Sequence, residues 1–210
     1  CSSDLTCIPQ SHGGIETFIN TLCKFDSKLG ITNLVLTLSS KPKKKPIEQD
    51  GYTVFQSRQD LFLASTGFSL NAFFKFRKLS NEADIIHYHF PNPFADLLHI
   101  ICRPRKKTIL TYHSDIIRQK FFLPFYKPLR EIFLHSLDKI VATSPNYFVT
   151  SDVLQKHSEK VSIIPIGIDN EKYCNLNKKR YQFWSKKLKK PFFLFLGELR
   201  YYKGLHIALN

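Results

Sequence analysis

The chain has 210 residues, of which 31 are Lys or Arg and 17 are Asp or Glu, so its formal net charge at neutral pH is +14. Hydrophobic residues make up 43% and aromatic residues 14% of the sequence, which supplies a packed core and excludes a disordered polypeptide. No apolar run reaches the roughly 18–20 residues that a membrane-spanning helix requires.

Seven short apolar runs, rich in β-branched residues, predict buried strands. The segments between most of them are long enough for helices, and Pro128 is expected to begin the continuous helix in the fourth such segment. This alternation predicts an α/β fold with a doubly wound parallel sheet and right-handed crossovers. The expected strands span 34–38, 52–55, 84–89, 108–113, 139–144, 161–165 and 192–196, and the expected helices span 15–29, 68–79, 93–102, 122–136 and 145–157.

The predicted first domain covers residues 6–170, because the alternation of strands and helices is continuous there. Residues 171–190 have no strand pattern and are interpreted as a basic connector, and residues 191–210 as the start of a second α/β domain. Residues 1–5 are typical of a translated cloning adapter and are set aside. Because the last residues stop inside an expected helix, the chain is interpreted as a fragment.

Five cysteines are scattered along the sequence, with no C-x-x-C pair and no histidine at metal-ligand spacing. We therefore expect reduced thiols in a cytoplasmic protein.

The positive charge is concentrated in two clusters. Such clusters suit anionic lipid headgroups, phosphates or nucleic acid, and a solvated surface explains each of them equally well. The first cluster contains Lys41, Lys43, Lys44 and Lys45, and the second contains Lys172, Lys178, Lys179, Arg180, Lys186, Lys187, Lys189 and Lys190.

Two glycines, Gly13 and Gly14, precede the first expected helix and are followed by Glu16. Glycines at a strand-to-helix turn let the backbone approach a ligand, and the helix start offers free N–H groups to an anion; a tight turn explains the pair as well. The spacing is not G-x-G-x-x-G, which disfavours a dinucleotide-dependent oxidoreductase.

Histidines gather where two expected strands end. His87 and His89 share one face of a strand, and because no third ligand is close in sequence, a structural or substrate-contacting role is favoured over a metal site. His113 and Asp115 follow the next strand, with Arg118 just beyond. An imidazole there can donate to a sugar hydroxyl or act as an acid or base, although a loop histidine satisfied by the backbone is the simpler alternative.

A serine hydrolase is disfavoured for residues 113–115, because three neighbours in sequence rarely point at one another and no G-x-S-x-G elbow occurs. Ser144 ends a later strand and is expected to cap a helix or contact a ligand. Arg200 and Lys203 flank an expected helix start, where cations and amide dipoles suit a diphosphate; a solvated basic turn is the alternative.

Together these segments resemble the family 4 glycosyltransferases, which have the GT-B fold of two Rossmann-like domains with the active site between them. The resemblance extends from about residue 10 to the end, and is nearest to bacterial enzymes that build surface polysaccharides such as lipopolysaccharide, often mannosyltransferases. It rests on Gly13-Gly14-Ile15-Glu16, Asp84-Ile85-Ile86-His87-Tyr88-His89, Thr111-Tyr112-His113-Ser114-Asp115, Ser144, Ile164-Pro165-Ile166-Gly167-Ile168-Asp169 and Gly197 through Gly204.

The resemblance implies a retaining hexosyltransferase that uses a GDP- or UDP-sugar, with no bound metal and no other cofactor. His113 would contact the donor sugar as the catalytic residue. Gly13 and Gly14 would approach the donor phosphates, and Arg200 and Lys203 would neutralise the departing diphosphate, since fixed cations stabilise developing charge. The residues expected on the acceptor side are Glu16, His89, Asp115, Arg118 and Ser144.

Two departures from the family pattern stand out. Glu198 occupies a position where the family often has arginine, and the family's acidic E-x7-E pair would lie beyond residue 210. We therefore expect the chain alone to be inactive, with most of the acceptor half and little of the donor half.

The expected acceptor is a saccharide or a lipid-linked sugar at the inner face of the plasma membrane. An anionic membrane surface would attract the basic clusters, next to the aromatic stretch 121–126, and no nucleic-acid partner is expected. The alternative function is a basic nucleic-acid-binding module without catalysis, although the sequence has no zinc finger or aromatic RNA-binding signature.

Overall fold

The computed structural model describes residues 13–63, 66–116, 123–168, 177–188, 190–195 and 204–208. The chain divides into two compact units, Cys1–Gly167 and Ile168–Asn210.

The strands of the first unit form three hydrogen-bonded sheets within the described residues. The first has the order β1-β3-β2, with β1 and β3 parallel and β2 antiparallel to β3; the second is a hairpin of β4 and β5. The third has the order β6-β7-β8-β9 and is parallel throughout. The strands are β1 (Asn33–Ser39), β2 (Ile47–Gln49), β3 (Tyr52–Arg58), β4 (Leu61–Leu63), β5 (Thr66–Phe68), β6 (Ile85–Phe90), β7 (Lys107–Tyr112), β8 (Lys139–Ala142) and β9 (Val161–Ile163).

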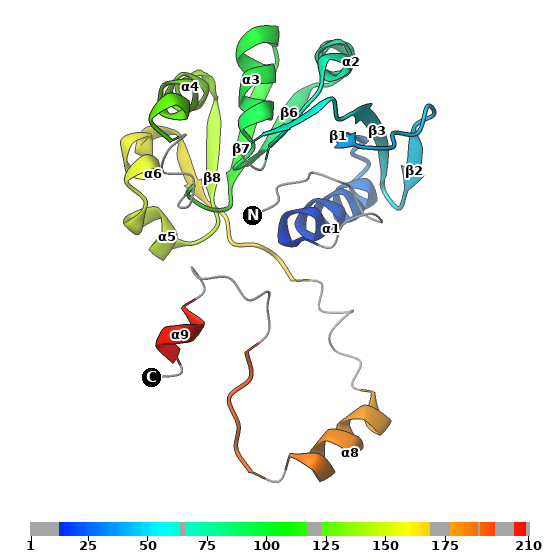
Figure 1. Ribbon diagram of the computed structural model, residues 1–210, viewed down its shortest axis with the longest axis vertical. Coiled ribbons are helices and arrows are strands. Elements are labelled where there is room, and N and C mark those ends of the chain that lie inside the picture. The colour runs from blue at the N-terminus through cyan, green and yellow to red at the C-terminus, as the bar shows by residue number, and fades with distance from the viewer. Residues whose placement is uncertain are drawn as a thin grey trace. The chain divides into compact units, whose positions relative to one another are not determined.

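Helices flank these strands, with α2, α3 and α4 on one side and α1 on the other (Figure 1). Their starts have sequence-encoded caps: the side chains of Ser69, Asn92, Ser144 and Ser151 each accept a hydrogen bond from a backbone N–H in the first turn. The helices are α1 (Gly14–Lys28), α2 (Leu70–Glu82), α3 (Pro93–Cys102), α4 (Leu123–Ser136), α5 (Pro145–Thr150) and α6 (Asp152–Lys156), followed by the 3-10 turn η1 (Ser158–Lys160).

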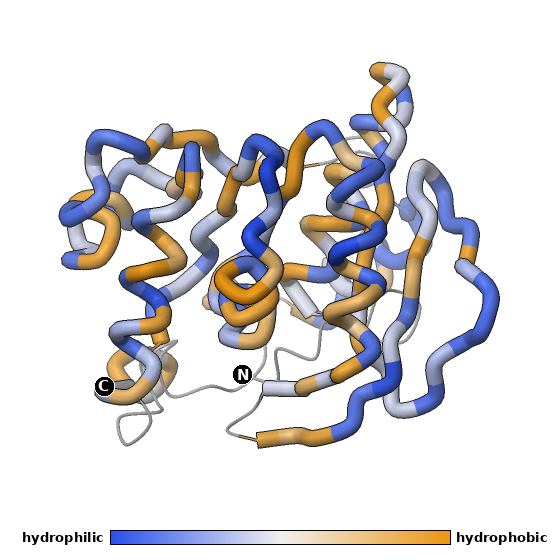
Figure 2. The backbone as a smooth tube through the Cα atoms, turned by 90° about the horizontal axis from the view of Figure 1, so that it is seen from above, coloured by the Kyte–Doolittle hydropathy of each residue, from blue (hydrophilic) through white to orange (hydrophobic). Residues whose placement is uncertain are grey.

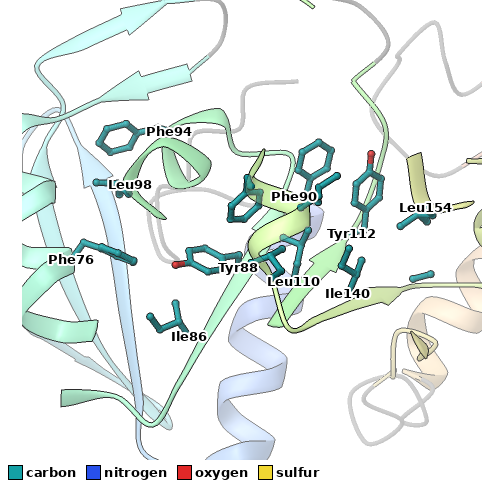
Figure 3. Packing of buried hydrophobic residues seen from close by; sticks show 14 of the residues in the cluster. Phe76, Ile86, Tyr88, Phe90, Phe94, Leu98, Leu110, Tyr112, Ile140 and Leu154 are labelled. Carbon is teal, nitrogen blue, oxygen red and sulfur yellow. The ribbon is translucent and has the colours of Figure 1, made fainter. Parts of the chain in front are cut away.

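The main core lies between the β6–β8 strands and the helices α2, α3 and α4. Tyr88, Leu110 and Ile140, one from each of these strands, lie in a row (Figure 3), and Phe133 and Leu134 of α4 are fully buried against the same cluster. A smaller cluster joins α1 to β3 through Ile19, Cys23, Tyr52 and Val54. The helical coils in Figure 2 carry both hydrophobic and hydrophilic segments, as helices with one buried face should.

A cavity of about 840 Å³ separates the two larger sheets. Its walls include Leu34 and Leu36 of β1, Ile85 and His87 of β6, and Phe76 of α2. The edges of β1 and β6 therefore face a hollow that apolar side chains line on both sides.

The predicted α/β fold with a parallel sheet is confirmed, and so are six of the seven expected strands. The seventh is wrong within the part that is described: residues 192–195 form neither helix nor strand, and Phe192, Phe193 and Leu194 are exposed. An apolar run pairs as a strand only where a neighbouring strand completes its hydrogen bonds.

The expected helices also need two corrections. The helix expected to begin at Pro128 begins at Leu123. Pro128 lacks an N–H and so removes one hydrogen bond of the helix, while the hydrogen bond from Tyr126 to Asp96 holds the turn before Pro128 in place. The helix expected over 145–157 is broken at Ser151, which ends α5 and caps α6.

In the second unit, the structure describes two helices, α8 (Lys178–Lys187) and α9 (Leu205–Ala208). The α8 helix lies in the segment interpreted as a basic connector, and the side chain of Asn177 caps its start. Within the described residues of both units, no helix combines the length and apolar character needed to cross a bilayer.

Candidate functional site

Three imidazoles stack where β6 and β7 end. The rings of His87 and His89 lie 4.5 Å apart between centroids, and those of His89 and His113 lie 5.5 Å apart with an interplanar angle of 26°. His113 directly follows β7, and its backbone N–H donates to the carbonyl of Phe90 at 3.0 Å. The parallel register therefore brings together two histidines that the sequence separates by 24 positions.

Hydrogen bonds fix the orientation of these rings. Nδ1 of His89 lies 3.2 Å from Nε2 of His113, and Nε2 of His87 lies 2.8 Å from Oγ1 of Thr111. The contact between His89 and His113 uses Nε2 of His113, and Nδ1 of His113 has no hydrogen-bond partner among the described residues.

The three imidazoles are held in the neutral form. Burial lowers the pKa of His87 and of His113 to about 4, and the charge of His87 adds to the effect on His113. Burial and the two neighbouring imidazoles keep the pKa of His89 well below its usual value. At neutral pH each ring therefore offers one donor and one acceptor rather than a positive charge.

Phe18 connects the histidines to the glycine loop. Its ring meets His113 edge to face at 5.1 Å and His89 at 5.7 Å. Phe18 lies on α1 one turn after Gly14, so this packing brings the start of α1 alongside His113. Phe18 was not predicted as a site residue, because nothing local distinguishes it from a core aromatic residue.

The two glycines at the start of α1 differ in the space beside them. Gly13 has an extended backbone (φ −75°) and begins α1 without a side-chain cap, so the first N–H groups of the helix are not used by a capping residue. A Cβ on Gly14 would have no neighbour within 4 Å, whereas one on Gly13 would meet the flexible Glu16 carboxylate at 2.0 Å. The packing of the described residues therefore does not require a glycine at position 14.

The carboxylate of Asp115 links three separate segments of the first unit. It accepts hydrogen bonds from the hydroxyls of Tyr112 at 2.8 Å, Tyr147 at 2.9 Å and Ser151 at 3.3 Å. Burial, together with this carboxylate, raises the pKa of both phenols above their usual range. Asp115 thereby joins the loop after β7 to α5 and α6, and holds the segment that carries His113.

Of the other predicted residues, Ser144 caps α5, its Oγ accepting from the N–H of Tyr147 at 3.1 Å, which confirms its expected capping role. Arg118, Arg200 and Lys203 lie outside the described residues. Within the described ranges, no group of three or more His, Cys, Asp or Glu side chains is placed to hold a metal ion.

Residues 12–172 match the sequence profile of Glycosyltransferase Family 4. The chain is similar to D-rhamnosyltransferase WbpZ of Pseudomonas aeruginosa, with 50% identity over 98% of this chain and 54% of the relative. It is also similar to O-antigen chain mannosyltransferase C of Escherichia coli, with 42% identity over 98% of this chain and 55% of the relative. The chain thus spans about half the length of the curated relatives it matches.

Proposed function

The chain belongs to glycosyltransferase family 4, and we propose that it supplies the acceptor-side half of a retaining hexosyltransferase of polysaccharide synthesis. The reaction moves a hexose from a nucleotide diphosphate, of guanosine or uridine, to a saccharide or lipid-linked acceptor. The bond between the anomeric carbon and the diphosphate oxygen breaks, and a glycosidic bond to the acceptor oxygen forms. The nucleoside diphosphate leaves and takes up the proton that the acceptor hydroxyl loses.

The placement of His113 beside the start of α1 carries this proposal. Phe18 holds the imidazole against the helix start, whose uncapped N–H groups and open space at Gly14 suit an anion such as a diphosphate. A neutral imidazole next to that anion does not form an ion pair with it, so its N–H can donate a hydrogen bond to a sugar hydroxyl. His113 then positions the hexose while the diphosphate departs.

The relatives suggest the class of sugar. They are named for D-rhamnose and for mannose, and D-rhamnose is mannose without the hydroxyl at C6. We therefore propose a donor sugar of the manno configuration.

The remaining site residues complete this hypothesis. Glu16 lies beside the glycine loop and His89 beside His113, where an acceptor hydroxyl would meet the donor sugar. Arg118 and Ser144 are proposed on the acceptor side, and Asp115 as the residue that holds that side together. Arg200 and Lys203 are proposed to neutralise the diphosphate, in a reaction without a bound metal.

The proposed domain organisation follows from these roles. Residues 6–170 form the acceptor-side domain, residues 171–190 connect, and residues 191–210 begin the domain that binds the nucleotide. We propose that the enzyme works at the cytoplasmic face of the membrane, because a lipid-linked acceptor resides there and a net charge of +14 favours anionic lipid.

The test uses the full-length protein that carries this sequence. His113→Ala should lower transfer from GDP-mannose or GDP-D-rhamnose by about 10²–10⁴-fold, the range typical of a positioned imidazole, while circular dichroism shows that the protein remains folded. His135→Ala, at an exposed histidine near the end of α4, is the matched control and should transfer normally. A His113→Ala enzyme with wild-type transfer would remove this residue from the reaction, and an inverted anomer in the product would refute retention.

A further inference from the structure

The β4–β5 hairpin and the start of α2 expose an unusual number of large apolar side chains. Three consecutive residues of β4, Leu61, Phe62 and Leu63, are 56%, 48% and 52% exposed, and Leu70 and Phe74 of α2 are 76% and 77% exposed. Leu70 and Phe74 are four residues apart, so they lie on one face of the helix. We call these five residues the apolar platform.

Hydrogen bonds hold the platform in a defined conformation. The N–H of Asp60 donates to the carbonyl of Phe68 at 2.8 Å, and the carboxylate of Asp60 accepts from the N–H of Leu70 at 2.9 Å. These two bonds join the base of the hairpin to the first turn of α2. The exposed apolar groups therefore stand on a fixed support.

A cationic loop adjoins this support. Lys41, Lys43, Lys44 and Lys45 follow the end of β1 and are exposed, while the hairpin follows the end of β3. The two strand ends are paired in parallel register, and the N–H of Gln59 donates to the carbonyl of Ser39 at 2.9 Å. The lysine loop and the apolar platform thus emerge from neighbouring strands.

The platform also adjoins the candidate site. Phe68 of the hairpin packs edge to face on Phe94 of α3, with centroids 5.5 Å apart. Phe94 lies four residues after Phe90, whose carbonyl accepts from the N–H of His113. The hairpin and His113 therefore lie at the same carboxyl edge of the parallel strands.

We propose that the apolar platform and the lysine loop together dock this protein on an anionic lipid bilayer, with the site of His113 facing the membrane. Apolar side chains insert at the boundary between headgroups and acyl chains, and each Lys near an anionic surface adds about 1 kcal/mol of attraction. This inference rests on the proposed use of a lipid-linked acceptor, since it brings that acceptor to the edge where the histidines lie.

Two other surfaces of the described chain could compete for this role. Phe125 of α4 is 84% exposed, and α8 carries five basic residues with exposed Phe183 and Trp184. Tyr126, next to Phe125, is instead committed to a hydrogen bond with buried Asp96. We place the docking surface at the platform because Phe68 and Phe94 connect it to the strand edge that carries His113.

The test measures flotation of the full-length protein with vesicles of phosphatidylcholine, with and without 30% phosphatidylglycerol. We expect the double variant Phe62→Ser/Phe74→Ser to lower the partition coefficient at least tenfold. Lys44→Ser/Lys45→Ser should lower binding to anionic vesicles roughly 30-fold, as two lysines at about 1 kcal/mol each imply, and leave binding to neutral vesicles unchanged. The matched controls, Phe125→Ser/Val149→Ser on α4 and α5 and Phe183→Ser/Trp184→Ser on α8, should bind within twofold of wild type.

Transfer to a water-soluble acceptor in detergent separates docking from catalysis. The Phe62→Ser/Phe74→Ser variant should keep this activity, and should lose transfer only to an acceptor embedded in vesicles. Wild-type vesicle binding by that variant, or an equal loss in either control, would overturn the proposal. A wild-type protein that docks through the platform yet transfers no sugar would leave the docking surface standing and refute the proposed enzyme.

Discussion

Replacing Asp115 with alanine should destabilise the first unit strongly, because three hydroxyls share that one carboxylate. A hydrogen bond to a charged group contributes about 1.5–3 kcal/mol, and the three bonds here are not additive since they share an acceptor. Tyr112 is fully buried, so in Asp115→Ala water could not replace the lost acceptor of its hydroxyl. We expect a loss of roughly 3–5 kcal/mol in the free energy of unfolding, a large part of the 5–15 kcal/mol typical of a domain.

Two milder changes keep this prediction testable if the alanine variant does not fold. In Asp115→Asn, the amide oxygen can accept from Tyr112 and Ser151 while the amide nitrogen donates to Tyr147, so the cost should be about 1 kcal/mol. Tyr147→Phe removes one bond and leaves two, and should also cost about 1 kcal/mol. The order of stability should be wild type, then these two variants together, then Asp115→Ala.

Urea denaturation followed by circular dichroism measures these differences, with the slope of the transition checked for two-state behaviour. Lys139→Ala, at an exposed residue that begins β8, serves as a control and should change stability by less than about 0.5 kcal/mol. If Asp115→Ala is as stable as this control, the carboxylate does not anchor α5 and α6, and its role lies with the acceptor instead.

Three pH-dependent predictions follow from the buried and paired groups. Burial lowers the pKa of His87 from 6.5 to about 4, so its contribution to stability is complete above pH 6.5 and is lost as pH falls toward 4. Urea titrations of His87→Gln should therefore show less destabilisation by acid between pH 6.5 and 4 than those of the wild type. Hydrogen bonds from Lys107 and Thr108 lower the pKa of Asp138 from 3.8 to about 2, so Asp138→Asn should flatten the stability loss measured between pH 4 and 2, and an unchanged slope would contradict the pairing. Burial raises the pKa of Asp96 from 3.8 to about 8, so folding favours the protonated acid and stability should fall as pH rises from 4 to 8. Asp96→Asn should remove that fall in urea titrations, and unfolding of Asp96→Asn at pH 7 would show that the ionised form is needed.

Much of the parallel sheet could be predicted from the sequence, because its strands are buried on both faces and read as continuous apolar runs. Strands β2, β4 and β5, of three residues each, were not predicted, whereas the equally short β9 was, because it begins a longer apolar run over residues 161–165. The run at 192–196 was misassigned for the opposite reason: it has strand composition, but pairing depends on a neighbour that sequence composition does not reveal.

The candidate site divides along the same line. His89 and His113 could be predicted as neighbours, because His89 lies near the end of β6 and His113 directly follows β7, and parallel strands end at a common edge. The contacts of Phe18 with both histidines and of Asp115 with Tyr147 and Ser151 could not, since they join segments whose distance in space depends on packing of the whole unit.

The two buried clusters give the two halves of the site unequal protection against local opening. The glycine loop begins α1, which packs on the smaller cluster of four buried residues, whereas His113 follows a strand of the larger one. Amide hydrogen exchange should therefore be faster in α1 and β3 than in β7 and β8, since fewer buried contacts oppose opening there. An opening that frees α1 would separate Phe18 from His89 and His113, so the packing around these two imidazoles depends on the smaller of the two clusters.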